Sequence, residues 1–301
     1  MKKSIAIIGN GKVARALTLA FLKSGMSIES IIVIGRNEEN LSYFKEKGIQ
    51  TSVNILGASG IPNIILAVTP GGVGPQIKRL KELDLQKNQK LICVCSGIDA
   101  NYCANFLGIN NDQVISATIN TNVEYTSGII CLSKEDETKK IFEPLGEVIF
   151  ESSDDILKSV VSVGSMNAFD SKFIELAIGN QSIKKWLDNC ENSDLVIQYL
   201  KNKTRVLVSE MGYTETQAKK RSVESFKSCV SALSLIQDIK LDDIDTHAKK
   251  VITRGGCTEK GINNLKTLEM FLSFEDLSDA IRPVYERTLQ FKSDVMQSFA
   301  K

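Results

Sequence analysis

Apolar and polar positions divide the chain into two halves with different periods. In the first half, short apolar runs that suit buried strands alternate with charged stretches that suit solvent-facing helices. We expect strands at Ile5–Ile8, Ile31–Ile34, Asn63–Val68, Leu91–Cys95, Gln113–Ala117, Ile129–Leu132 and Glu147–Phe150. This alternation predicts an α/β domain with a doubly wound parallel sheet over residues 1–151.

The second half, residues 152–301, has the spacing of helices. Thr214 to Gln217 read Thr-Glu-Thr-Gln, a capping box that starts a helix. Apolar residues then recur at steps of three and four, on one predicted face formed by Val223, Phe226, Val230 and Leu233. An all-helical domain is therefore predicted to follow the sheet, with this apolar face in the core or against another subunit.

A glycine pattern follows the first predicted strand. Gly9-Asn10-Gly11-Lys12-Val13-Ala14 fits Gly-x-Gly-x-x-Ala and leads directly into a helical stretch. Gly9 permits a sharp turn, Gly11 lets a pyrophosphate approach the backbone, and the helix N-terminus offers N–H donors to phosphate. The pattern predicts a dinucleotide site; the alternative is a purely structural turn.

Residues after the next strands refine this site. Arg36 and Asn37 stand where an acidic residue would bind the ribose of NAD, and an arginine there suits the 2′-phosphate of NADP. We therefore predict NADPH, with NADH as the alternative cofactor and an exposed loop arginine as the alternative for Arg36. Thr69-Pro70 and Ser96-Gly97 follow later strands and are expected to flank the cofactor.

The amino-acid composition limits the kinds of partner that we expect for this protein. Lys and Arg total 37 against 36 for Asp and Glu, so no net field attracts nucleic acid or an anionic membrane. The start of the chain lacks a signal-peptide core and no apolar run approaches the ~20 residues of a membrane span, so a cytoplasmic protein is expected. Seven cysteines without a Cys-x-x-Cys pair, and one histidine, indicate neither a disulfide framework nor a metal site. A small-molecule substrate is favoured.

One irregular segment interrupts the helical half, from Val251 to Gly261. Gly255 and Gly256, flanked by Thr253 and Thr258, can present several backbone N–H groups to an anion such as a carboxylate. A plain interhelical loop is the alternative interpretation.

With these motifs in hand, the chain resembles the pyrroline-5-carboxylate reductase family over nearly its whole length. The family's Gly-x-Gly-x-Met-Ala turn is matched from Gly9 to Ala14, with Val13 in place of methionine. Its Ala-Val-Lys-Pro segment resembles Ala67-Val68-Thr69-Pro70, and its Ala-Gly-Ile loop resembles Ser96-Gly97-Ile98. The Pro-Asn-Thr-Pro motif is reduced to Asn120-Thr121, and a cofactor-contacting asparagine falls on Asn54.

The clearest match lies in the helical half, where Ser-Pro-Gly-Gly-x-Thr resembles Thr253-Arg254-Gly255-Gly256-Cys257-Thr258. The resemblance implies an NAD(P)H-dependent reductase with a Rossmann-type domain and a helical dimerisation domain, whose active site includes residues of the partner subunit. It implies that the loop amides bind the substrate carboxylate and that Thr258 lies near the ring nitrogen. The catalytic residues are then Thr253 and Thr258.

The motifs, read residue by residue and together with the resemblance, give two sets of predicted binding residues. The predicted substrate residues are Asn120, Arg254, Gly255, Gly256 and Cys257. The predicted cofactor residues are Gly9, Gly11, Lys12, Val13, Arg36, Asn37, Asn54, Val68, Thr69, Pro70, Ser96 and Gly97.

Departures from the family fall on the substrate side. The family's Ser-Gly-Ser-Gly-Pro-Ala-Tyr stretch corresponds to Ser162 to Ala168, which keeps little beyond small residues, and Asp170 to Asp194 forms an insertion. Arg254 replaces a proline and could contact a second anionic group on the substrate. The resemblance makes reduction of a cyclic imine acid the leading hypothesis, with 1-pyrroline-5-carboxylate to L-proline as the default. A protonated imine is already electrophilic, so this reaction needs no strong general acid.

Three alternative functions and the role of one cysteine stay open. His247 could be the acid of a ketone reductase, or a polar helix residue. A β-hydroxyacid dehydrogenase is disfavoured because Lys172 does not have that family's spacing from Gly164. A non-catalytic relative that binds NADPH and acts as a sensor is favoured by the altered stretch after Ser162. Cys257 could be a reactive thiol or a small loop residue.

Overall fold

The computed structural model describes residues 3–95, 98–152, 155–252 and 256–300. They form two compact units. The first, here called the sheet unit, comprises Met1–Ile119, Ile130–Leu157 and Leu289–Lys301. The second, the helical unit, comprises Asn120–Ile129 and Lys158–Thr288. The segment Asn120–Ile129 thus belongs to the helical unit, although it follows one strand of the sheet and includes the first two residues of the next, Gly128–Leu132. The boundary after residue 151 stays a prediction.

The sheet unit contains one sheet of eight strands in the order β3-β2-β1-β4-β5-β6-β7-β8. The strands are β1 (Ile5–Ile8), β2 (Ile31–Ile34), β3 (Gln50–Ser52), β4 (Asn63–Leu66), β5 (Lys90–Cys93), β6 (Val114–Ile119), β7 (Gly128–Leu132) and β8 (Gly146–Phe150). Strands β1 to β6 pair in parallel, and β7 runs antiparallel to β6. The predicted doubly wound sheet is confirmed.

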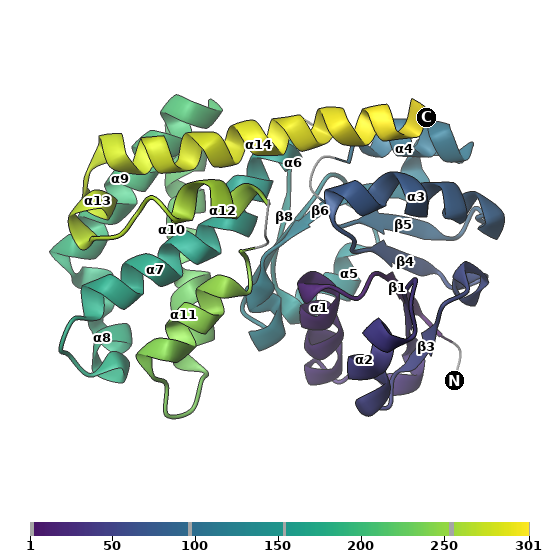
Figure 1. The fold of residues 1–301 in the computed structure, drawn as a ribbon, viewed down its shortest axis with the longest axis horizontal. Coiled ribbons are helices and arrows are strands. Elements are labelled where there is room, and N and C mark those ends of the chain that lie inside the picture. Colours follow the sequence, from purple (N-terminus) through teal and green to yellow (C-terminus); the bar gives the residue numbers. More distant parts are fainter. Residues whose placement is uncertain (1–2, 96–97, 153–154, 253–255, 301) are drawn as a thin grey trace. The chain divides into compact units, whose positions relative to one another are not determined.

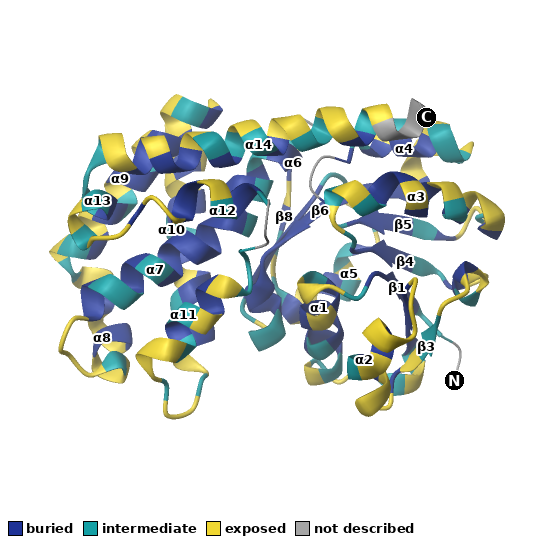
Figure 2. Cartoon of the chain, in the orientation of Figure 1, coloured by how far each residue is buried: buried dark blue, intermediate teal, exposed yellow. Residues whose placement is uncertain are grey.

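Helices cover both faces of this sheet (Figure 1). They are α1 (Lys12–Lys23), α2 (Ser42–Glu46), α3 (Pro70–Leu80), α4 (Ala100–Leu107) and α5 (Lys139–Phe142). On one face, α3 and α4 pack with the end of the last helix against alternate strand residues such as Ile8 and Leu66. On the other face, Phe21 of α1 contacts Phe142 of α5, with ring centroids 6.3 Å apart. Because both faces are covered, strand residues of both parities are buried (Figure 2).

Agreement with the predicted elements is closest in the central strands. β1 and β2 begin and end at the predicted residues. β3 is missing from the prediction because Gln50–Ser52 is polar and lies at the sheet edge. The charged stretch before Gly48 forms a 3₁₀ turn at Glu39–Leu41, which is followed by the short helix α2.

The helical unit consists of helices packed pairwise. Its elements are a π-helix at Val160–Ser165, α7 (Met166–Ile178), α8 (Ile183–Asn189), α9 (Asp194–Met211), α10 (Glu215–Ser234), α11 (Leu241–Lys249), α12 (Cys257–Ile262), α13 (Leu268–Leu272) and α14 (Phe274–Ala300), whose first part alone lies in this unit. Helix α6 (Asp155–Ser159) begins in the sheet unit and ends in the helical unit. Helix α7 packs against α10 and α11, and α10 packs against α9. The predicted helical half is confirmed. The segment Asp170 to Asp194 forms the rest of α7, α8 and the start of α9.

Helix α10 shows where spacing alone misleads. Thr214 caps it through the predicted box, with the Thr214 hydroxyl accepting from Gln217 N. On its predicted apolar face, however, Val223 and Val230 are only half-buried, whereas Ser225 and Cys229 are buried. The buried face is therefore rotated toward small and polar side chains. Within the described residues, no helix combines the length and apolar character needed to cross a membrane.

Candidate functional site

One candidate site lies in the sheet unit, at the edge where the carboxyl ends of its parallel strands meet. Because β1, β2 and β4 are parallel, their carboxyl ends meet at this edge and carry Gly9, Arg36 and Thr69. The chain leaves β1 toward β2 and β3, and β4 returns to the other side of β1. This reversal between β1 and β4 is the topological switch point, where ligands of doubly wound sheets bind.

Gly9 is required by the backbone at the switch point. Its φ is +133°, and a Cβ there would stand 2.1 Å from the carbonyl oxygen of Ala67. The Gly9 N–H donates to Ile34 O at 2.8 Å, and the Ala67 N–H donates to Ile8 O at 2.8 Å. Any side chain at Gly9 would therefore push β1 and β4 apart.

Gly11 has a different environment. It is exposed, it precedes the first residue of α1, and a Cβ added there would meet no heavy atom within 4 Å. Lys12 is exposed and Val13 is half-buried in the first turn of α1. The protein itself does not need a glycine at this position, so the open space suits a phosphate group held close to the backbone.

The other predicted cofactor residues fall into two groups. Arg36 is exposed directly after β2, and the exposed Asn37 turns the chain by accepting from Glu39 N at 2.8 Å. Thr69 is the N-cap residue of α3, with Pro70 in the first turn, and the Val68 N–H donates to Cys95 Sγ at 3.4 Å. These residues follow the carboxyl ends of β2 and β4, and their contact with a cofactor stays a prediction.

Two predictions at this edge need separate comment. The Asn54 side chain accepts from Leu56 N at 2.9 Å and caps a 3₁₀ turn, which gives Asn54 a structural task. Ser96 and Gly97 lie outside the described residues. The remaining residues suit a dinucleotide, because an open glycine, a helix start and an exposed arginine stand at the ends of adjacent strands.

A separate candidate site lies in the helical unit, around the first turn of α12. Thr258 is 5% exposed, and its hydroxyl donates to Ser165 Oγ at 3.0 Å. Gly256 is the N-cap residue of α12, and Cys257 is the first helical residue. Burial raises the pKa of the Cys257 thiol, which disfavours the thiolate that a reactive cysteine needs. Thr253, Arg254 and Gly255 lie outside the described residues.

Asn120 belongs to a buried network of amides and hydroxyls. Its amide nitrogen donates to Ser228 Oγ at 3.1 Å, and its amide oxygen accepts from Ile129 N at 3.0 Å. Asn122 also donates to Ser228 Oγ at 2.9 Å, and Ser228 donates to Ser127 O at 2.6 Å. Asn120 is therefore already engaged at both ends of its amide.

His247 is 1% exposed, and its Nδ1 lies 2.9 Å from Ser171 Oγ. Its Nε2 is buried and has no hydrogen-bond partner within the described structure. Burial, with a smaller contribution from the charge of Lys250, lowers the pKa of His247 to about 3. The imidazole is thus neutral near pH 7, which argues against a protonated His247 as the acid of a ketone reductase.

A fully buried ion pair was missed by the sequence analysis. Lys203 Nζ on α9 donates to Asp170 Oδ1 on α7 at 2.6 Å, and both side chains are 0% exposed. Tyr199 OH donates to the same carboxylate oxygen at 2.9 Å, and Ser225 Oγ donates to Asp170 Oδ2 at 2.6 Å. Burial lowers the pKa of Lys203. The partners come from three helices, so no local sequence pattern could reveal them.

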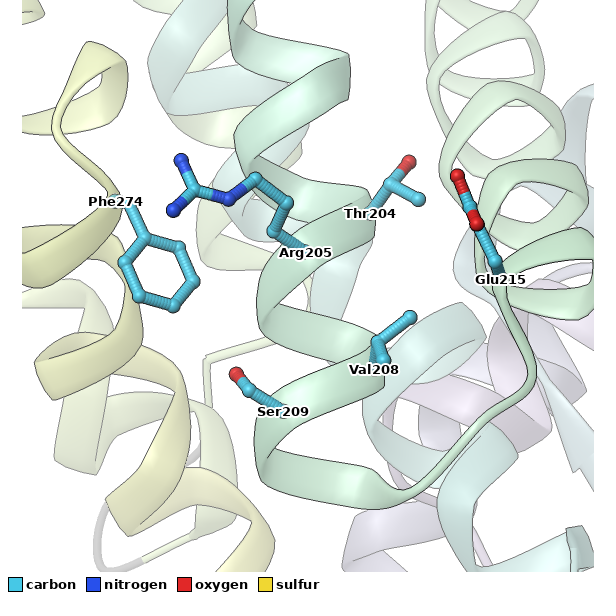
Figure 3. A pocket seen from close by; sticks show the side chains of 6 residues that line it. All are labelled: Thr204, Arg205, Val208, Ser209, Glu215 and Phe274. Atoms are coloured by element: carbon cyan, nitrogen blue, oxygen red, sulfur yellow. The ribbon is translucent and has the colours of Figure 1, made fainter.

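A shallow hollow of about 310 Å³ lies elsewhere on the helical unit. It is lined by Thr204, Arg205, Val208, Ser209, Glu215 and Phe274 (Figure 3). The guanidinium carbon of Arg205 lies 4.2 Å from the ring centroid of Phe274, so this arginine covers the aromatic wall. No predicted site residue lines the hollow, and we assign it no function. In the parts of the chain that the structure describes, no cluster of three or more His, Cys, Asp or Glu side chains could hold a metal ion.

The chain is similar to known proteins in part of its sequence and in its fold. Residues 4–97 match the family described as NADP oxidoreductase coenzyme F420-dependent. A pyrroline-5-carboxylate reductase of Haemophilus influenzae is 35% identical over 97 residues, which cover 32% of this chain and 35% of that relative. The match thus spans about a third of the curated relative, over a stretch comparable in length to the family match.

The fold agrees over a much longer stretch. The Plasmodium falciparum pyrroline carboxylate reductase with NADP bound covers 96% of this chain and 98% of its own, with a TM-score of 0.57 and 16% identity. The chain resembles the pyrroline-5-carboxylate reductase family. The Streptococcus pyogenes 1-pyrroline-5-carboxylate reductase likewise covers 96% of this chain and 99% of its own, with a TM-score of 0.56 and 18% identity. The resemblance found in the motifs is therefore confirmed, in sequence for about a third of the chain and in fold for nearly all of it.

Proposed function

We propose that this chain is a divergent NAD(P)H-dependent reductase of a cyclic imine acid, with 1-pyrroline-5-carboxylate as substrate and L-proline as product. The observation that carries the proposal is the hydrogen bond from Thr258 to Ser165 at the start of α12. Thr258 donates its only hydroxyl proton to Ser165, so the Thr258 oxygen can act only as an acceptor toward another group. An acceptor is what the N–H of a protonated imine requires.

On the cofactor side, the carboxyl edge of the sheet supplies the contacts. Gly9 and Gly11 would let the pyrophosphate approach the start of α1, and Arg36 would pair with a 2′-phosphate. Thr69 and Pro70 would flank the nicotinamide nucleotide. When bound, reduced nicotinamide supplies a hydride equivalent. NADPH is proposed over NADH because Arg36 stands where an acidic residue would favour NADH.

On the substrate side, the loop before α12 would hold the acid. The backbone amides of Gly255, Gly256 and Cys257 would donate to the carboxylate, and Thr258 would orient the ring nitrogen. A protonated imine is already electrophilic, so positioning supplies most of the rate enhancement and no strong acid is needed. The buried, neutral His247 agrees with this chemistry. A homodimer and a cytoplasmic location stay predictions from the sequence and its resemblance.

The test is turnover by the purified protein. NADPH oxidation is followed with 1-pyrroline-5-carboxylate and with its six-membered analogue. We expect turnover with the five-membered ring, and a fall in kcat of about 10- to 100-fold in Thr258→Ala. Thr258→Ser keeps the hydroxyl and should retain most of the activity.

The outcomes separate the alternatives. Turnover only with the larger ring, or with a keto acid, would replace the proposed substrate. NADPH binding without turnover on any imine would favour the non-catalytic sensor. Equal rates in wild type and Thr258→Ala would contradict the role given to Thr258.

A further inference from the structure

Two segments of the helical unit are attached to the same turn at the start of α7. The first is the turn at Thr121–Tyr125, which follows Asn120. The second is the start of α12, where Thr258 donates to Ser165 Oγ at 3.0 Å. Asn167 lies two residues beyond Ser165 and binds the first segment. The relative placement of the two segments is thus set by one short stretch of helix.

Asn167 is 0% exposed, and both ends of its amide are used. Its amide oxygen accepts from Asn122 Nδ2 at 2.9 Å, and its amide nitrogen donates to Thr121 Oγ1 at 3.2 Å. Its backbone carbonyl accepts from Ser171 Oγ at 2.7 Å. A side chain without an amide at position 167 would remove one hydrogen-bond partner from Thr121 Oγ1 and one from Asn122 Nδ2.

The orientation of these amides follows from their neighbours. Ser228 donates to Ser127 O at 2.6 Å, so its oxygen acts as acceptor toward Asn122 Nδ2. Asn122 must therefore point its nitrogen at Ser228 and at Asn167 Oδ1, which directs Asn167 Nδ2 to Thr121. The donors and acceptors of these contacts are consistent with one another, while Asn122 Oδ1 is buried without a hydrogen-bond partner among the described residues.

The remaining anchors of the turn come from other helices. Asn120 and Asn122 both donate to Ser228 on α10. At the end of α11, Lys250 Nζ donates to Glu124 Oε2 at 2.9 Å and to Tyr125 OH at 3.0 Å. Asn167 differs from these anchors because it lies on the same turn as the partner of Thr258.

We propose that Asn167 is a positioning residue, which fixes the Thr121–Asn122 turn relative to Thr258. We call the hydrogen bonds of Asn167 to Thr121 and Asn122 the tether. The proposal rests on the proposed function, because it gives this tether a role in presenting the substrate to the Thr258 hydroxyl. Asn167 acts through its neighbours and has no assigned contact with substrate. Its loss should lower kcat while leaving the affinity for NADPH unchanged, since the cofactor residues belong to the sheet unit.

The experiment compares Asn167→Ala with two further variants. Thr121→Val removes the hydroxyl at one end of the contact while keeping the shape of the side chain. Tyr199→Phe is the matched control, because it removes an equally buried hydroxyl of the helical unit that bonds Asp170 rather than the turn. Each variant is measured by amide hydrogen exchange, steady-state kinetics and NADPH affinity, and thermal unfolding confirms that it is folded.

We expect exchange of residues 120–129 to accelerate about 10-fold or more in Asn167→Ala, less in Thr121→Val, and not in Tyr199→Phe. We expect kcat to fall about 10- to 100-fold in Asn167→Ala with KM for the imine changed less than about threefold. Asn167→Asp should recover most of kcat where its buried carboxyl group is protonated, because the neutral acid can accept from Asn122 and donate to Thr121 Oγ1.

The readouts distinguish this proposal from the proposed function. Unchanged exchange of residues 120–129 in Asn167→Ala would overturn the tether, whatever the activity of the protein. A loss of kcat no larger than that of Tyr199→Phe would overturn the positioning role. A wild type without turnover would refute the proposed function and with it the role in presenting substrate, while exchange would still decide whether the tether exists.

Discussion

The sheet unit and the helical unit bury side chains of different kinds. The central strands of the sheet unit bury aliphatic side chains on both faces, as in Ile5–Ile8 and Ile31–Ile34. Among the described residues, the charged side chains that are 0% exposed, Asp170 and Lys203, both belong to the helical unit. A sheet satisfies its own backbone and needs only apolar covering, whereas these helices also bury side chains that require specific partners. Substitutions should therefore lower the free energy of unfolding by graded amounts in the sheet unit, and abruptly in the helical unit where a buried polar group loses its partner.

The largest effect should come from breaking the buried ion pair. Lys203→Met leaves the Asp170 carboxylate buried without its cation, which should lower the free energy of unfolding by about 3–5 kcal/mol. Chemical denaturation measures this loss. Lys172→Met, which breaks a partly exposed pair with Glu175 on the same helix as Asp170, should cost no more than about 1 kcal/mol. Equal losses in the two variants would show that burial of the pair is not what makes it sensitive.

The two glycines of the first turn sharpen the comparison within the sheet unit. Gly9→Ala forces a Cβ against Ala67 O at positive φ, and should cost about 3 kcal/mol of stability besides weakening NADPH binding. Gly11→Ala has open space and should leave stability within about 0.5 kcal/mol while weakening NADPH binding. Denaturation and NADPH titration separate the two effects. Normal NADPH affinity in Gly11→Ala would contradict the dinucleotide site.

Acid should weaken the helical unit through His247. The pKa of His247 is about 3 in the folded protein, against 6.5 for an unperturbed histidine. Below pH 6.5 the unfolded chain therefore binds a proton at this imidazole and the folded chain does not. The stabilisation is present in full above pH 6.5 and is lost as pH falls, with about 2 kcal/mol gone at pH 5. Denaturation of wild type and His247→Gln across pH 5–7.5 measures it. A constant difference between the two proteins would mean that His247 does not stay neutral in the fold.

The smallest effect concerns the exposed arginine of the sheet unit. Arg36→Asp should lower the preference for NADPH over NADH by about 10-fold or more, because it removes a cation and adds an anion beside the 2′-phosphate. The ratio of kcat/KM for the two cofactors measures this change. Stability should stay within about 0.5 kcal/mol, since Arg36 is exposed. An unaltered ratio would leave Arg36 as an ordinary loop residue.

The difference between the units also explains what the sequence could predict. β1 and β2 were placed residue by residue because an apolar run between polar residues marks a buried strand. β3 could not be found, since Gln50–Ser52 carries no apolar signal. The glycine turn and Arg36 were predicted because cofactor chemistry requires specific residue types near strand ends.

Prediction in the helical unit fails where partners are distant in the sequence. The buried face of α10 includes Ser225 because Lys203 and Asp170 bond to it, which spacing within α10 cannot reveal. Asp170 lies in a segment that the family pattern identifies only as an insertion. Asn120 was predicted as a substrate residue, yet its amide is occupied by Ser228 and Ile129 N. That assignment stays a prediction, and Asn167 is the neighbour whose role only the structure suggested.

The most direct test of the central claim is transfer of deuterium from NADPH labelled at C4 to 1-pyrroline-5-carboxylate, followed by mass spectrometry of the product. We expect the wild type to form proline with deuterium on the ring carbon of the former C=N bond. Thr258→Ala should form much less of this labelled proline. Absence of labelled proline from a wild type that binds NADPH would contradict the assignment of this chain as a reductase of that imine.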